Sequence, residues 1–429
     1  MKSKIMTAYV EFYKYIKQIH KVTAKTNTIF NIFFLLIPTY INKLQHLLIF
    51  KNYNYIKIKI FNECYNSIMK LCFFVNNYTF TGGLERVFSI VTNGLSSKVP
   101  LDIVSMYSIP SESPYHHANN INIHVIHHKQ NKSYINDSFK TIKTLKKIVK
   151  DNKYDYLIYV SELLSPFAYS ACKNTNTKCV CWMHTPAFAY DNPIIQRALR
   201  YYSMKKANYT ITLTQKSKDK LISKYNTSKV SFIPNPIDPE LLKYNTAYDS
   251  NSKKIISVGR ICFAKNYEKL IEVAKQTLPE LPGWTWDIYG DGDQKILNTL
   301  KSLIQEYKLD NKVFLKGNSN NIYDEYQNYS MLVMTSRYEG FPMTLLEAMS
   351  KNLPLIAFDI LTGPGEIIKD HVNGLLIEPF NTNQMTNSIL YLANNKEERL
   401  KMSKETKNFI DLYSLDHITD LWIKTLNSI

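Results

Sequence analysis

The sequence lacks the cysteine spacings that hold a disulfide-rich or zinc-binding chain together. Its six cysteines include no CxxC pair, and 429 residues are enough to bury cores without disulfides. We therefore expect reduced, buried thiols. Cys179 and Cys181 alternate in the apolar run KCVCWMH. Alternate residues of a strand share one face, so this spacing favours core packing over metal binding.

The sequence also lacks a long uninterrupted apolar run. Its most apolar stretch, residues 28–41, contains Asn31 and Pro38, whereas a membrane-spanning helix needs about 20 consecutive apolar residues. No small-residue cleavage site of a secretory signal follows it. Two interpretations of residues 1–68 stay open: interfacial helices on an anionic bilayer, or an upstream addition to a functional chain that begins at Met69.

The charge is strongly unbalanced, with few acidic residues near the N-terminus. The net charge is +17, and residues 1–70 carry 11 lysines against two glutamates, a net charge of +9. Zinc spacings, aromatic ribonucleoprotein motifs and basic heptads are lacking, so nucleic acid is not the expected partner. An anionic membrane surface or an anionic small ligand fits better.

One lysine-rich segment, SFKTIKTLKKIVK (138–150), is expected to be an amphipathic helix. Its spacing places Phe139, Ile142, Leu145 and Val149 on one side and the lysines elsewhere. This is an ordinary surface helix by default. Together with the basic excess, it supports the hypothesis of peripheral attachment to an anionic bilayer that presents a lipid-linked acceptor.

Alternating strand and helix patterns run from Met69 onwards. In the first series, strands are expected at 71–75, 102–108, 154–160, 178–184 and 209–214, with helices near 84–95, 138–150 and 194–207. The prolines of VSFIPNPIDPELL then suit a rigid connector. A second series has strands at 253–260, 285–292, 312–317, 331–336, 353–359 and 374–379, with helices at 266–277, 294–306, 342–350, 396–410 and 414–426.

This alternation predicts two doubly wound parallel α/β domains that bind ligand in a cleft at the carboxyl ends of their strands. The expected division is an extension at 1–68, a first domain at 69–238, a second at 239–408 and a closing helix at 409–429.

The stretch SRYEGFPMTLLEAM places Glu339 and Glu347 eight positions apart. In one straight helix they would lie about 12 Å apart along the axis, too far for a glycosidase acid pair. Pro342 suits the first helical position, which puts Glu339 in a loop, Glu347 in the helix and both at the mouth of the cleft. Free helix N–H groups suit a phosphate and a carboxylate suits a vicinal diol. Two solvated carboxylates are the alternative.

Two cations accompany the glutamates in SVGRICFAKNYEKL. Arg260 directly follows a predicted strand, and Lys265 lies on the loop before the next helix. Cations at strand ends of one domain are placed where a diphosphate would need them. As isolated residues they would be solvated charges.

Seven ordered motifs carry a family resemblance: TGGLERV, WMHTP, IPNPID, SVGR with Lys265, IYGDG, SRYEGFPMTLLEAM and FDILTGPGEIIKDHVNGLL. From Met69 to the C-terminus, about five-sixths of its length, the chain resembles the retaining, nucleotide-sugar-dependent glycosyltransferases of family 4. That family has the EX7E motif and the GT-B fold, with two facing Rossmann-like domains and the active site in the cleft. The N-terminal extension has no counterpart in it, and Gly365 stands at a position that varies.

The resemblance implies roles for individual residues. Arg260 and Lys265 would hold the donor diphosphate, Glu339 would lie beside the transferred sugar, Glu347 would take the ribose hydroxyls, and His184 would reach the sugar and phosphate across the cleft. It also implies backbone contacts with the donor or acceptor at Gly340, Phe341, Pro342, Gly82 and Gly83.

The expected activity is transfer of a hexose or N-acetylhexosamine from a nucleotide-sugar, a UDP-sugar by family frequency, to a saccharide or lipid-linked acceptor. The resemblance implies retention of configuration, a role in surface polysaccharide synthesis such as lipopolysaccharide or capsule, and a cytoplasmic site at the inner face of the cell membrane. Alternatives are a nucleotide-sugar epimerase of the same fold and a non-catalytic nucleotide-sugar-binding protein. A dehydrogenase is disfavoured because TGGLERV is not GxGxxG.

No cofactor and no essential metal are expected. DGD (291–293) has the spacing of a metal-binding DxD signature, but a glycine turn after a strand explains it. Structural or solvated roles are favoured for the histidines of the first domain, since no cysteine or carboxylate shares their spacing and INIHVI alternates like a half-buried strand; they are His116, His117, His124, His127 and His128.

Overall fold

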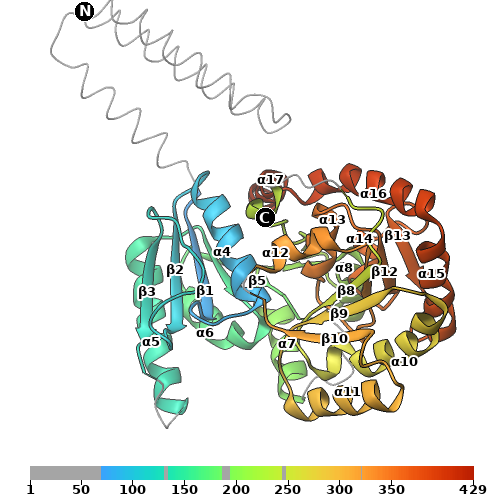
Figure 1. The fold of residues 1–429 in the computed structure, drawn as a ribbon. Helices are drawn as coiled ribbons and strands as arrows, with labels where there is room; N and C mark the ends of the chain where they lie inside the picture. The colour runs from blue at the N-terminus through green and yellow to red at the C-terminus, as the bar shows by residue number, and fades with distance from the viewer. Residues whose placement is uncertain (1–68, 130–133, 186–193, 244–247, 320) are drawn as a thin grey trace, which may run out of the picture. The chain divides into compact units, whose positions relative to one another are not determined.

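The computed structural model describes residues 69–129, 134–185, 194–243, 248–319 and 321–429. The chain divides into two compact units, residues 1–68 and 69–429. The first unit lies outside the described residues, and so do the interfacial helices hypothesised there. The second unit consists of two lobes (Figure 1).

The first lobe, residues 69–237, is built around a seven-stranded parallel sheet of order β3-β2-β1-β4-β5-β6-β7. Its strands are β1 (Leu71–Asn77), β2 (Leu101–Tyr107), β3 (Asn122–His127), β4 (Tyr156–Val160), β5 (Lys178–Trp182), β6 (Tyr209–Thr212) and β7 (Val230–Phe232). Its helices are α4 (Gly83–Ser96), α5 (Tyr134–Asn152), η1 (Glu162–Leu164), α6 (Ser165–Cys172), α7 (Ile194–Lys206) and α8 (Gln215–Tyr225).

The second lobe, residues 254–410, has a six-stranded parallel sheet of order β10-β9-β8-β11-β12-β13. Its strands are β8 (Lys254–Val258), β9 (Thr285–Tyr289), β10 (Val313–Gly317), β11 (Met331–Met334), β12 (Leu355–Phe358) and β13 (Gly374–Ile377). Its helices are η2 (Phe263–Lys265), α10 (Tyr267–Thr277), η3 (Leu278–Glu280), α11 (Gln294–Glu306), α12 (Ile322–Glu325), η4 (Tyr326–Asn328), α13 (Met343–Ser350), α14 (Pro364–Ile367), α15 (Thr382–Asn394) and α16 (Lys396–Ile410).

The central strands are apolar on both faces because helices cover both faces of each sheet. All residues of β2 and of β4 are buried, as are those of β11 and β12. This explains why the sequence shows continuous apolar runs rather than strict alternation. The prediction of two parallel α/β domains is confirmed.

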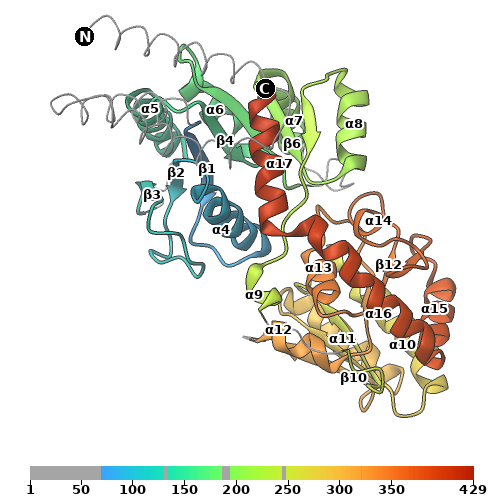
Figure 2. The same ribbon diagram turned by 90° about the horizontal axis from the view of Figure 1, so that it is seen from above.

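The chain passes between the lobes twice. The short helix α9 (Pro239–Leu242) belongs to the first crossing, and the turn η5 (Asp411–Tyr413) to the second. The last helix, α17 (Leu415–Asn427), then lies against the first lobe beside α4 (Figure 2). There the Trp422 ring is 5.1 Å from the Trp182 ring, and the Tyr156 hydroxyl donates to the Leu426 carbonyl at 2.6 Å. The C-terminal helix therefore completes the core of the first lobe.

Two local predictions were wrong. Phe139 of α5 is 71% exposed, because Asp137 and Thr141 take the inner face and bond to Tyr107 and His127. Helix α13 begins at Met343, one residue after the predicted first position, with Pro342 as its N-cap.

The thiol prediction holds for most of the described cysteines, but not for Cys262. Cys179 and Cys181 are free, buried and packed in one core cluster, as their spacing predicted. Cys262 is free but only partly buried, since it lies in the loop after β8. Within the described residues, no helix is both long and apolar enough to cross a membrane.

Candidate active site

The loops after β8 and β9 approach each other through glycine. Gly290 has a φ of +133°, and a Cβ built there would lie 2.0 Å from the Gly259 carbonyl oxygen. Only a residue without a side chain permits this approach. Arg260 leaves the sheet directly after that contact, so the glycine pair fixes where its guanidinium can reach.

The loops after β8 and β11 are joined by a buried asparagine. Asn266, which is 1% exposed and has a left-handed backbone, donates its side-chain amide to the Thr335 carbonyl at 3.1 Å. The Thr335 hydroxyl in turn donates to the carbonyls of Lys265 and Asn266 at 3.3 and 3.2 Å. These contacts hold the loop that carries Lys265 against the loop that leads to Glu339.

Lys265, in the loop after β8, and Glu339, in the loop after β11, form an ion pair. Lys265 Nζ lies 2.7 Å from Glu339 Oε1, and the Ser336 hydroxyl donates to the same oxygen at 2.6 Å. The two side chains are 18% and 12% exposed. Glu339 Oε2 accepts no hydrogen bond from the described residues, so the carboxylate is fixed through one oxygen and the other stays open.

The backbone between the glutamates is also tightly packed. Gly363 has a φ of +107°, and a Cβ there would lie 2.8 Å from Pro342 Cδ and 3.2 Å from Glu339 Cβ. The Thr362 hydroxyl donates to the Glu339 carbonyl at 2.6 Å. Phe341 is buried, while Gly340 is partly exposed. The turn before α13 is therefore held in place by the loop after β12.

Glu347 lies in α13, as the sequence predicted, and its carboxylate faces the first lobe. The residue is 3% exposed and both carboxylate oxygens have partners. Oε1 forms an ion pair with Arg86 of α4, and Oε2 accepts from the Tyr326 hydroxyl at 2.7 Å. A guanidinium from the opposite lobe therefore covers the carboxylate that the sequence placed at the mouth of the cleft.

The first-lobe glycine loop faces Arg260. A Cβ on Gly82 would lie 2.6 Å from Glu85 Oε2 and 3.9 Å from Arg260 Nη2, whereas one on Gly83 would meet open space. Burial raises the pKa of Glu85, and the nearby Arg260 partly opposes that shift. Arg260 is exposed and forms no hydrogen bond with another described residue.

His184 lies directly after β5 in the first lobe. Its ring is 4.3 Å from the Trp182 ring, and its buried Nε2 has no hydrogen-bond partner among the described residues. Desolvation lowers the pKa of His184 to about 3. The imidazole is therefore neutral at physiological pH.

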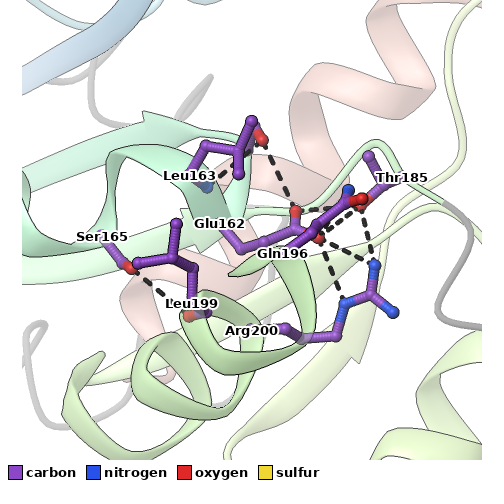
Figure 3. Close-up of polar contacts among 8 residues, drawn as sticks. Glu162, Leu163, Ser165, Thr185, Gln196, Leu199 and Arg200 are labelled. Atoms are coloured by element: carbon purple, nitrogen blue, oxygen red, sulfur yellow. Dashed lines mark hydrogen bonds and ion pairs between the residues drawn. The ribbon is translucent and has the colours of Figure 1, made fainter. Parts of the chain in front are cut away.

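Glu162 and Arg200 form a buried ion pair that the sequence did not predict (Figure 3). Glu162, at the carboxyl end of β4, is fully buried and pairs with Arg200 of α7 at 2.8 Å. The Thr185 hydroxyl lies 2.8 and 2.9 Å from the two Glu162 oxygens, and the Gln196 amide donates at 3.3 Å. This network ties the residue after His184 to β4 and α7. An isolated glutamate after an apolar run was the only signal in the sequence.

The remaining candidate ligands have structural roles. Asp293 caps α11 by accepting from the N–H groups of Lys295 and Ile296, and Asp291 accepts from Gly292 N–H. His127 is buried against Asp137, 3.6 Å away. Among the residues that the structure describes, no three His, Cys, Asp or Glu side chains are grouped to hold a metal ion.

The sequence of each lobe matches a glycosyltransferase family. Residues 81–241 match Glycosyltransferase Family 4, and residues 240–409 match Glycosyl transferases group 1. The chain belongs to the glycosyltransferases. This confirms the resemblance that the motifs indicated. The boundary between the two matches falls at α9, where the chain first crosses between the lobes.

Three relatives align with more than two thirds of this glycosyltransferase. It is 29% identical to an uncharacterised glycosyltransferase of Haemophilus influenzae, over 82% of this chain and 98% of that protein. It is 29% identical to the amylovoran biosynthesis glycosyltransferase AmsD of Erwinia amylovora, over 70% and 84%. It is 28% identical to the poly(ribitol-phosphate) alpha-N-acetylglucosaminyltransferase of Staphylococcus aureus, over 69% of this chain and 60% of that protein.

Solved structures share the fold at low sequence identity. TarM of S. aureus, solved with UDP, superposes with a TM-score of 0.70 at 18% identity, covering 84% of this chain and 100% of TarM. HepE of Anabaena, also solved with UDP, gives a TM-score of 0.69 at 17% identity, covering 84% of this chain and 100% of HepE. The expected GT-B fold is confirmed.

Proposed function

We propose that this glycosyltransferase moves a hexosyl or N-acetylhexosaminyl group from a UDP-sugar to a saccharide or lipid-linked acceptor, with retention of configuration. The product would belong to a cell-surface polysaccharide. The observation that carries the proposal is the partly exposed Lys265–Glu339 pair, at the edge where the loops after β8 and β11 meet. The UDP bound in TarM and HepE supports a uridine nucleotide, and AmsD supports the pathway class.

The proposed chemistry follows from where charge develops. Breaking the anomeric bond leaves negative charge on the departing diphosphate, and cations already in place are complementary to that transition state. Lys265 and Arg260 would hold the diphosphate, and the N–H groups that begin α13 would add partial positive charge. The scheme assigns this charge stabilisation to side chains and requires no metal ion.

The other predicted residues take supporting roles in this scheme. Glu339 would contact the transferred sugar through its open oxygen, Glu347 would bind the ribose hydroxyls, and neutral His184 would meet the sugar from the first lobe. The turn Gly340–Phe341–Pro342 would line the donor, while Gly82 and Gly83 would approach the diphosphate or acceptor. We place the reaction in the cytoplasm, at the inner face of the membrane, where the lysine-rich surface would meet anionic lipid.

The test is a panel of nucleotide-sugars, read by thermal shift and by slow donor hydrolysis. We expect one or more UDP-sugars to stabilise the protein, and Arg260→Met to remove the shift. Lys269→Met is the matched control, because Lys269 forms an exposed pair with Glu272 within α10. Failure of every nucleotide-sugar to bind would contradict the proposal. Inversion of the anomeric centre in the product would contradict retention alone.

A further inference from the structure

Arg86 of the first lobe lies in a socket formed by the second lobe and the connector. Its guanidinium pairs with Glu347 and lies 5.4 Å from the centre of the Tyr323 ring. The Tyr323 hydroxyl donates to Asp238, at the end of the connector, at 2.9 Å, and the Tyr326 hydroxyl takes the other Glu347 oxygen. An arginine held by a carboxylate and an aromatic face is a built contact rather than a chance surface pair.

The electrostatics of the socket favour the charged pair. Glu347 raises the pKa of Arg86 further above its ordinary value, and Tyr323, Tyr326 and Asp238 add to that effect. The Arg86 side chain is 24% exposed and the Glu347 side chain 4%. Charges that are largely removed from water are screened less than surface pairs, so this contact contributes more than an exposed ion pair.

The same contact obstructs the function proposed for Glu347. A vicinal diol binds a carboxylate by donating two O–H groups to its oxygens. Each oxygen has room for a second hydrogen bond, but Arg86 and Tyr326 cover the carboxylate, and the Glu347 side chain is only 4% exposed. A ribose can bind Glu347 only after one of these donors withdraws. Tyr326 is fully buried within the second lobe, whereas Arg86 comes from the opposite lobe and can leave with it.

Glu85, the residue before Arg86, also faces a residue of the second lobe, with the charges reversed. Glu85 precedes Arg86 in α4, and its carboxylate lies near Arg260, the cation expected to hold the diphosphate. Glu85 and Arg86 of the first lobe thus face Arg260 and Glu347 of the second lobe, each opposite a residue of the other charge.

We propose that Arg86 is a positioning residue of the donor site that holds the Glu347 carboxylate in the ligand-free enzyme and is displaced by the ribose diol of the donor. This rests on the proposed function, because it takes Glu347 as the ribose site. Since the Arg86–Glu347 contact exists only without donor, it opposes donor binding, and removing it strengthens binding. Loss of one charge-assisted hydrogen bond corresponds to a change of about tenfold in affinity.

The experiment compares UDP binding by calorimetry in the wild type, Arg86→Met and Lys98→Met. Lys98 follows α4 and pairs with Asp420 outside the site, so it is the matched control. Arg86→Met is expected to lower the melting temperature of the free protein and to bind UDP about tenfold more tightly, whereas Lys98→Met leaves the dissociation constant of UDP unchanged. A purely structural role for Arg86 would lower stability without strengthening binding.

A second ligand locates the effect at the ribose. For 2′-deoxy-UDP, which lacks one hydroxyl of the diol, the gain on Arg86→Met is expected to be smaller than for UDP. Arg86→Gln, which keeps a polar side chain without the charge, gives the same comparison if the methionine variant does not fold. If the wild type binds UDP and Arg86→Met binds it equally or more weakly, the displacement of Arg86 is overturned, while the proposed function stands. Failure of the wild type to bind any nucleotide overturns the proposed function and this inference with it.

Discussion

Each lobe carries a glutamate–cation pair where strands of its sheet end, and the two pairs differ in how much water reaches them. Glu162 and Arg200 of the first lobe are 0% and 4% exposed, and hydrogen bonds reach both carboxylate oxygens. Glu339 and Lys265 of the second lobe are 12% and 18% exposed, and one carboxylate oxygen stays open. Both partners of the first pair belong to one lobe and are buried, so we expect that pair to hold the fold, whereas the second pair keeps one carboxylate oxygen open to a ligand.

The largest expected effect comes from breaking the Glu162–Arg200 pair. Arg200→Met leaves Glu162 buried without its cation, so we expect the free energy of unfolding to fall by about 3–5 kcal/mol. Urea denaturation measures this. Lys243→Met, which breaks an exposed pair with Glu240, should change stability by no more than about 1 kcal/mol. Equal losses of unfolding free energy in Arg200→Met and Lys243→Met would show that burial does not make the Glu162–Arg200 pair more important for stability.

Breaking the Lys265–Glu339 pair should affect catalysis instead of stability. Lys265→Met removes a cation expected at the departing diphosphate, so we predict a decrease in kcat of about 10²–10³-fold, with the melting temperature changed by no more than a few degrees. Transfer assays and thermal denaturation on the same preparation separate the two effects. A large loss of stability with normal kcat would show that this pair is structural like the first.

The glycine contact beneath Arg260 should give a smaller change. Gly290→Ala forces a side chain into a left-handed backbone and against the Gly259 carbonyl, and the conformation alone costs about 1–2 kcal/mol. We expect reduced stability together with weaker UDP binding, because the loop that carries Arg260 must shift. Gly283→Ala, where φ is +77° and a Cβ would meet only the Lys253 side chain at 3.6 Å, serves as the control for backbone strain, and it should leave UDP binding unchanged.

The last prediction concerns the pH dependence of stability. The pKa of His184 is lowered to about 3 in the folded protein, so the unfolded chain binds its proton first as the pH falls below about 6.5. Stability from neutral His184 is therefore lost between pH 6.5 and 3, by at most about 1.4 kcal/mol per pH unit. His184→Gln should flatten the slope between pH 7 and 5, whereas a change at exposed His371 should not. An unchanged slope in His184→Gln would contradict a neutral, desolvated ring.

The parts of the fold that the sequence predicted are those with strong local patterns. Buried parallel strands read as continuous apolar runs, and α4 and α11 show clear helical spacing. Helix α8 was missed because only Ser217 and Leu221 of its eleven residues are buried, which leaves little apolar periodicity. Strand β7 was missed because it has three residues and adjoins the prolines of the connector.

The site was predictable to the extent that strand ends gather at one edge of a parallel sheet. Arg260, Lys265 and Glu339 follow strands of one sheet, so topology alone brings them together. The partner of Glu347 was not predictable, because Arg86 is 261 positions away in sequence and lies in the other lobe. Charge pairs across lobes leave no periodic signal in a single sequence, and the same holds for Glu162 and Arg200, 38 positions apart.

The most direct test of the central claim is a crystal structure of the protein with a non-hydrolysable UDP-sugar. We predict its diphosphate within hydrogen-bond distance of Arg260 and Lys265, with the sugar beside the open oxygen of Glu339. A diphosphate bound elsewhere, with the Lys265–Glu339 pair unchanged and empty of ligand, would contradict the account.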